Sequence, residues 1–316
     1  MMTDRHRAVP ERNRSKMNLY EAIFQRSSVR KFSMIPVEES VLSRIGNFFS
    51  QIEPLFPGVD AEIGIVENVE GKHLCHGLFG VTAPYYLTIY SEKRDKSEMN
   101  AGYLAEHLCL YMLTLGLGSC FLGSATLRGI PKVRMEPNVP SSRRESSALH
   151  ETAPSSAVEG SQIPSGGRTI RESTRRTPSR KELVIVIAFG IPAGRLTRRP
   201  EHAKRLPVRE LCVFKDQPSR WMTQVIEAAR LAPSAMNRQP WRFVVVNTRI
   251  HIFSKKDGMD KPRRWDEFSF GVMFAHIAIA SEELWLDVDL IRLENISQKN
   301  FKSNQYVLSA IVRVPE

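Results

Sequence analysis

The hydrophobic positions of the chain follow two patterns, which together predict an α+β protein. Segments rich in Val, Ile, Tyr and Phe between turn residues predict β-strands, at residues 62–66, 84–90, 183–189, 242–247 and 306–314. Segments with helical spacing of apolar residues predict α-helices, at residues 18–26, 37–52, 100–115, 219–231 and 269–286. Residues 183–189 are apolar throughout, which predicts a strand covered on both faces.

The order helix, strand, long helix occurs twice along the chain. One helix and its following strand match a later pair at a single offset, residues 45–49 and 62–66 against 225–229 and 242–246. Gly102 and His107 in one long helix correspond to Gly271 and His276 in the other. Such a repeat indicates two similar halves packed around one core. The identities are few, so chance similarity between amphipathic helices is the alternative.

Two polar segments interrupt this pattern. Residues 1–16 are basic, and residues 134–180 are rich in Ser, Arg, Pro, Thr and Glu with few large apolar side chains. Neither buries enough apolar surface to offset the entropy of ordering, so both are expected to be disordered. The remaining chain then divides into a first half, 17–133, and residues 181–316, which complete the first half and add the second. Together these form one compact unit.

The formal net charge of +11 lies in segments outside the patterned elements. The basic excess is found in residues 1–16, 134–180 and 195–209. A nucleic-acid surface would need basic residues on a folded face, so solvated tails are the favoured interpretation and no nucleic-acid partner is expected. Nucleic-acid binding through the tail and insert is the weakest alternative.

Membrane and metal sites are not indicated either. Residues 108–127 are uncharged, but glycines and small polar residues interrupt them short of the roughly 20 apolar residues that a membrane span needs. The four cysteines, Cys75, Cys109, Cys120 and Cys212, form no C-x-x-C pair and no metal-ligand spacing. We expect a cytoplasmic protein with no metal and no membrane contact.

Arg26, Ser28 and Arg30 alternate directly after the first predicted helix. In extended backbone, alternate side chains face the same way. Two guanidiniums around a hydroxyl suit a phosphate, or a polyol chain that carries one. Arginine and serine at a helix end are also common surface residues, so this motif alone decides nothing.

A second motif, at residues 232–243, connects a predicted helix to a predicted strand. Pro233 and Pro240 stop regular structure. Between them stand Ser234, Asn237 and Gln239, polar groups on a short rigid loop. An ordinary helix-to-strand connection explains the prolines, but it does not explain the clustered amide side chains.

Two further segments have a possible ligand role. Residues 115–123 are rich in glycine and follow an apolar helix, which predicts a loop whose backbone N–H groups approach a flat ligand. A helix C-cap and turn is the alternative. After the strand ending in Phe189-Gly190, basic residues including Arg205 are suited to a phosphate or to a solvated loop.

Together these segments resemble the FMN-dependent nitroreductase family. In that family an R-x-S-x-R-like element, here Arg26, Ser28 and Arg30, contacts the ribityl chain and phosphate. A basic residue before Leu-Pro, here Arg205, helps to hold the phosphate. The resemblance implies a three-layer α+β fold, with a central, mostly antiparallel sheet and helices on both faces.

The resemblance assigns the two remaining motifs to the flavin ring. The glycine-rich segment 116–123 matches a family loop whose end, here Leu122 and Gly123, presents a backbone N–H near flavin N5. The A-P-S-x-x-N-x-Q-P-W segment contacts the ring region from the partner subunit, which implies roles for Pro233, Ser234, Asn237 and Gln239.

The chain departs from the family in where these motifs stand. The A-P-S segment usually follows the first amphipathic helix, but residues 49–54 lack it. The second half has that segment and lacks both the R-x-S-x-R element and the glycine loop. Two degenerate halves would then complement each other, as in the family branch with fused halves. We expect one complete flavin site in a monomer, with a homodimer as the alternative.

The function implied by the resemblance is electron transfer from NADH or NADPH, through FMN, to a nitroaromatic, a quinone or a similar flat small-molecule acceptor. Flavin would supply the chemistry and the protein would bind and orient it, so no catalytic side chain is assigned. His107 and His276 are expected to pack between helices. The alternative is an FMN-binding storage or regulatory protein without turnover.

Overall fold

The computed structural model describes residues 17–72, 75–76, 80–123, 126–127, 134–137, 181–256, 264–299 and 301–314. The disorder expected for residues 1–16 and 138–180 falls outside these ranges. Residues 134–137 were expected to be the first residues of the disordered insert. This expectation is wrong, because they form a strand that pairs with residues 62–65.

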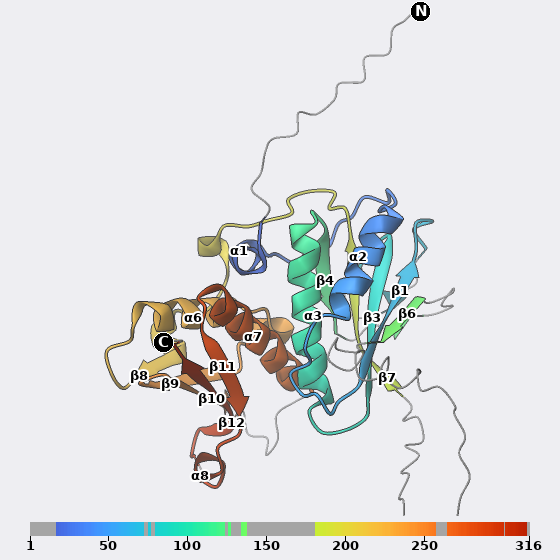
Figure 1. The fold of residues 1–316 in the computed structure, drawn as a ribbon. Coiled ribbons are helices and arrows are strands. Elements are labelled where there is room, and N and C mark those ends of the chain that lie inside the picture. The colour runs from blue at the N-terminus through green and yellow to red at the C-terminus, as the bar shows by residue number, and fades with distance from the viewer. Residues whose placement is uncertain are drawn as a thin grey trace, which may run out of the picture.

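The first half of the chain forms a five-stranded antiparallel sheet in the order β4-β7-β3-β1-β6 (Figure 1). Its strands are β1 (Ala61–Glu67), β3 (Tyr85–Glu92), β4 (Gly118–Leu122), β6 (Arg134–Pro137) and β7 (Lys181–Gly190). A separate two-stranded pair joins β2 (Cys75–His76) to β5 (Thr126–Leu127). The sequence predicted a loop at 115–123; instead β4 occupies most of it, because its backbone pairs with β7.

The second half repeats this sheet. Its order is β11-β12-β10-β9-β8, and each of the first four strands takes the place of a strand in the first sheet. Its strands are β8 (Cys212–Phe214), β9 (Trp241–Val246), β10 (Arg249–Lys255), β11 (Asp287–Ile291) and β12 (Asn304–Arg313). All neighbours are antiparallel except β8 and β9, which run parallel. The internal repeat and the α+β fold predicted from the sequence are thereby confirmed.

The fifth strand of the second sheet comes from the segment that follows the first half. After β7 the chain crosses over the top of the view in Figure 1 and then reaches β8. This crossing contains a 3-10 turn, η1 (Pro200–His202), and the short helix α5 (Val208–Leu211). The segment that follows the first half therefore contributes one strand to the second sheet.

Two of the helices, α1 (Leu19–Gln25) and α6 (Arg220–Arg230), begin at a side-chain cap. The other principal helices are α2 (Glu39–Phe49), α3 (Ser97–Thr114) and α7 (Arg264–Glu283), with a short α8 (Glu294–Ser297). At α1, Asn18 and Glu21 form a capping box, in which each side chain accepts from the other residue's backbone N–H. Ser219 accepts from the backbone N–H of Met222 at α6. Among the described residues, no helix is long and apolar enough to cross a membrane.

β7 is covered on both faces, as its sequence predicted. Ile185, Ile187 and Phe189 belong to the main core, which includes residues of both long helices. Val186 and Ala188 point to a smaller core on the other face of the first sheet. An apolar residue at every position thus has an apolar environment.

The long helices α3 and α7 lie side by side at the centre of the molecule (Figure 1). They touch through their backbones. A Cβ added at Gly271 would lie 1.8 Å from the carbonyl oxygen of Met99, and one at Gly102 would lie 2.1 Å from that of Phe268. No larger residue fits at either position, which explains why glycine recurs at equivalent places in the two halves.

We expect Gly271→Ala to destabilise the fold by about 3 kcal/mol, because the added methyl forces α3 and α7 apart. Denaturant unfolding measures this loss. Gly194→Ala is the matched control, since a Cβ there meets nothing within 4 Å, and its effect should stay within about 0.5 kcal/mol. Equal losses for the two variants would show that the crossing does not depend on glycine.

Candidate functional site

The R-x-S-x-R segment lies between β4 and the crossing segment. Ser28 pairs with Ser119 of β4, and Arg26 pairs with Thr197 of the crossing segment. The thiol of Cys120 interacts with Arg30, Arg26 and Ser28, although burial has the larger effect and raises the pKa of that thiol. Arg26 is buried, whereas Arg30 is exposed.

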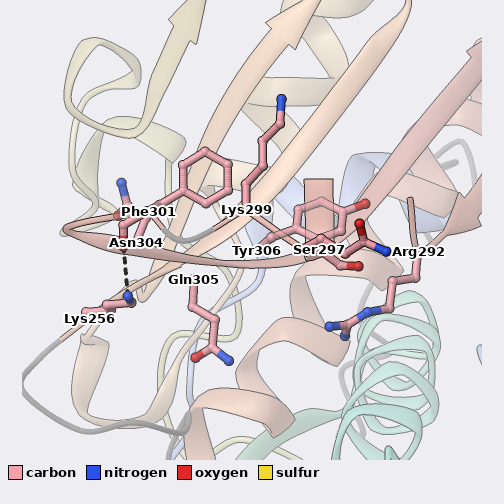
Figure 2. A pocket seen from close by; sticks show the side chains of 9 residues that line it. Lys256, Arg292, Ser297, Lys299, Phe301, Asn304, Gln305 and Tyr306 are labelled. Carbon is pink, nitrogen blue, oxygen red and sulfur yellow. Dashed lines mark hydrogen bonds between the residues drawn. The ribbon is translucent and has the colours of Figure 1, made fainter. Parts of the chain in front are cut away.

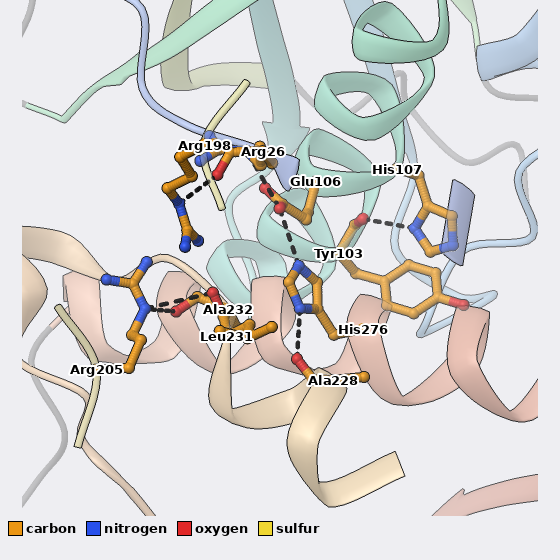
Figure 3. A network of polar contacts seen from close by, with 10 residues as sticks. All are labelled: Arg26, Tyr103, Glu106, His107, Arg198, Arg205, Ala228, Leu231, Ala232 and His276. Atoms are coloured by element: carbon orange, nitrogen blue, oxygen red, sulfur yellow. Dashed lines mark hydrogen bonds and ion pairs between the residues drawn. The ribbon is translucent and has the colours of Figure 1, made fainter. Parts of the chain in front are cut away.

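Arg26 belongs to a buried polar network that crosses from one half to the other (Figure 3). Its Nε lies 3.3 Å from Oε1 of Glu106 on α3. The same oxygen lies 3.0 Å from Nε2 of His276 on α7, and Nδ1 of His276 lies 2.8 Å from the carbonyl oxygen of Ala228 on α6. Burial alone would lower the pKa of Arg26, but the Glu106 carboxylate raises it. His276 therefore does more than pack between helices.

The A-P-S segment is held in shape by its own polar side chains. Gln239 Oε1 accepts from the backbone N–H of Leu206 at 2.7 Å, and Ser234 Oγ accepts from the backbone N–H of Gln239 at 2.9 Å. Met236, Asn237 and Gln239 have φ values of 52°, 56° and 49°. Left-handed backbone is unfavourable for residues other than glycine, so these hydrogen bonds maintain a strained loop.

Arg205 joins this loop to the end of α6. Its Nε donates to the carbonyl oxygen of Ala232 at 3.0 Å, and its Nη1 donates to Oδ1 of Asn237 at 2.7 Å. The structure thus brings Arg205, Asn237 and Gln239 together. Pro233 is half-buried at the start of the same loop.

Three arginines gather where the halves meet, with one buried carboxylate among them. Arg198 Nε donates to the carbonyl oxygen of Arg26 at 2.7 Å, and Figure 3 shows the guanidiniums of Arg198 and Arg205 facing one another. Burial lowers the pKa of Arg205 to about 10, and the positive charges of Arg198 and Arg26 contribute to the shift. The pKa of Arg198 is lowered by burial, then by Arg26 and Arg230.

This cluster has donors without acceptors. Arg26 Nη2 and Arg198 Nη1 are buried and make no hydrogen bond within the described part of the chain. Like charges with unpaired donors are unfavourable in a buried setting unless an anion joins them. The basic stretch that contains Arg198 was considered for a phosphate from the sequence, but only Arg205 was selected from it.

Leu122 and Gly123 end β4 beside the second half. A Cβ at Gly123 would lie 3.6 Å from the ring of Trp265 in the first turn of α7. Next to them, the Phe121 ring packs edge-on against Phe268, with 5.4 Å between ring centroids. The Arg26 guanidinium carbon lies 5.1 Å from the Phe121 ring centroid. The predicted residues of both halves thus converge on one junction.

A pocket of about 290 Å³ lies elsewhere, between α8 and the adjoining ends of β10 and β12 (Figure 2). It is lined by Lys256, Arg292, Ser297, Gln298, Lys299, Phe301, Asn304, Gln305 and Tyr306. Lys256 donates to the carbonyl oxygen of Phe301. The pocket contains none of the residues predicted from the sequence. No cluster suited to a metal ion is found within the described ranges.

Comparison with known proteins decides the family. The family model described as "Putative TM nitroreductase" matches residues 18–140 and 166–281. The chain belongs to this family. The recognition made from its motifs is confirmed.

The structure of a relative from Thermotoga maritima supports the fold of this nitroreductase-family protein. A "putative nitroreductase" from Thermotoga maritima is 19% identical, with 98% of this chain and 99% of that chain covered and a TM-score of 0.54. An FMN-dependent nitroreductase from Clostridium difficile R20291 is 18% identical, with 62% of this chain and 98% of that chain covered and a TM-score of 0.37. No curated protein matches the chain.

We expect Gln239→Ala to destabilise the nitroreductase fold by about 2 kcal/mol, because the backbone N–H of Leu206 loses its acceptor and the strained loop loses a brace. Urea unfolding measures the loss. Gln298→Ala, at an exposed glutamine of the second half, should change stability by less than about 0.5 kcal/mol. A similar result for both would mean that the loop does not depend on Gln239.

Proposed function

We propose that this protein is an FMN-dependent oxidoreductase with one flavin site at the junction of its halves. The observation that carries the proposal is the cluster of Arg26, Arg198 and Arg205, which has buried donors and a single buried carboxylate. A phosphate ester supplies the acceptors that these guanidiniums lack. Membership of the nitroreductase family supports an oxidoreductase activity.

The residues present suit the rest of the cofactor as well. Ser28 and Arg30 stand beside the cluster and would contact the phosphate and ribityl chain. The backbone at Leu122 and Gly123 would face the flavin ring from the first half. From the second half, the loop that holds Pro233, Ser234, Asn237 and Gln239 would contact the ring region.

In this proposal FMN, when bound, accepts electrons from NADH or NADPH and passes them to a flat acceptor such as a nitroaromatic or a quinone. The protein's own residues bind, orient and charge-balance the cofactor. The arginines would hold the phosphate, and their fixed positive charge would balance its negative charge. No side chain is required as a nucleophile, and solvent supplies protons.

The two halves complement each other, so we propose a monomer as the working unit. The first half provides Arg26 and the end of β4, and the second half provides the A-P-S loop. Arg205, on the crossing segment between them, binds that loop. Each contribution comes from within one chain.

We expect purified protein to be yellow, with about one FMN released per chain, and to be bleached by NADPH or NADH. Absorption spectroscopy and identification of the released flavin measure this, and sedimentation measures the mass of the loaded species. Flavin that is retained but never reduced by either nucleotide would favour a storage or regulatory role. Protein that refuses added FMN would contradict the proposal.

We expect Arg198→Ala to weaken FMN binding by about 10-fold to 100-fold, because a charged hydrogen bond to the phosphate is lost. Arg199→Ala is the matched control, since the neighbouring arginine is exposed, and its effect should be less than about 2-fold. Fluorescence titration with FMN and with riboflavin separates the contribution of the phosphate. Equal losses of riboflavin binding would argue against a phosphate role for Arg198.

A further inference from the structure

His276 stands between two hydrogen-bond acceptors. Nδ1 faces the carbonyl oxygen of Ala228 at 2.8 Å, and Nε2 faces a carboxylate oxygen of Glu106 at 3.0 Å. A neutral imidazole has one donor and one acceptor, whereas an imidazolium has two donors. When Glu106 is a carboxylate both partners accept, and the ring form that donates to both is the doubly protonated, positively charged one. Its side chain is 1% exposed, so no solvent replaces either partner.

Glu106 is shared between two cations. The same oxygen, Oε1, contacts Nε of Arg26 and Nε2 of His276, while Oε2 makes no hydrogen bond within the described residues. One negative charge therefore balances either Arg26 or His276, and the trio carries a net charge of +1. This remaining positive charge lies next to the arginine cluster, where it is available to bind an anion.

We propose that protonated His276 is a positioning residue for the cofactor phosphate: it holds Glu106 so that Arg26 keeps a free donor edge and its positive charge. This inference rests on the proposed function, because the phosphate is that of FMN. With a neutral residue at position 276, Glu106 pairs with Arg26 alone. The cluster then loses one unit of charge, and Arg26 turns from the anion to the carboxylate.

The groups around His276 are few. α3 contributes Glu106 and the neighbouring His107, α6 contributes the carbonyl of Ala228, and Arg26 follows α1. His107 occupies the equivalent place in the first half, but its Nδ1 contacts the carbonyl oxygen of Tyr103 on its own helix. Burial lowers the pKa of His107 to about 4, so this ring is neutral. It is a natural control for His276.

The test measures dissociation constants of FMN and riboflavin for wild type, His276→Gln and His107→Gln at about pH 6. We expect His276→Gln to weaken FMN binding about 10-fold, with riboflavin binding unchanged. His107→Gln should bind FMN as the wild type does. FMN binding by His276→Gln equal to that of the wild type would overturn the inference.

Two further measurements keep the outcome decisive. Nitrogen-15 NMR of the flavin-free wild type reports the charge of His276 directly, and a neutral ring at about pH 6 would overturn the inference whatever the variants do. In a Glu106→Gln background, adding His276→Gln should not weaken FMN binding further, because the competing carboxylate is gone. If the wild type binds no FMN, the proposed function itself fails, whereas a failure confined to His276→Gln leaves it standing.

Discussion

The backbone contact between α3 and α7 is the constraint on which the rest of the molecule depends. At Gly102 and Gly271 the two helices, which come from different halves, approach so closely that no side chain fits between them. Glu106 stands one turn beyond Gly102, and His276 stands just over one turn beyond Gly271. At this separation the two side chains meet across the seam at 3.0 Å. If the two helices were further apart, the buried carboxylate of Glu106 would lose its contact with His276. The close packing at the two glycines and the pairing of these side chains therefore depend on each other.

The halves share geometry even where they no longer share residues. α3 and α7 end in the same way, with Leu117 N donating to Met112 O and Leu286 N donating to Ser281 O, each at 2.9 Å. The left-handed residue of this cap is Gly116 in the first half, with φ 81°, and Trp285 in the second, with φ 56°. Tryptophan is unfavourable there but is 85% exposed and clashes with nothing that the fold requires. The first half retains glycine where β4 enters the proposed site, and the second half does not need it.

The sequence predicted the elements with strong periodicity and missed those defined by pairing. β10 and β11 were not predicted from the sequence, and β11 is short and half-exposed; pairing with β12 defines both as strands. The glycine-rich segment ending in Leu122 has low strand propensity, and only the neighbouring β7 makes it a strand. Glu106 was detectable as a charge inside an apolar helix. Its donors, Arg26 and His276, are distant in sequence, and no local pattern indicates that they share one oxygen.

The proposed site combines two costs that the same ligand would offset. Three arginines face one buried carboxylate, and Met236, Asn237 and Gln239 hold left-handed backbone beside them. Contacts within the surrounding fold maintain both unfavourable features. Arg205 is held by the carbonyl oxygen of Ala232 and by Asn237, and Gln239 is held by the backbone N–H of Leu206. An anion bound among the guanidiniums would supply the missing acceptors, and it would stabilise the folded state by an amount that grows with the logarithm of its concentration relative to its dissociation constant. Under the proposed function, binding at the junction and cohesion of the two halves therefore draw on the same interactions.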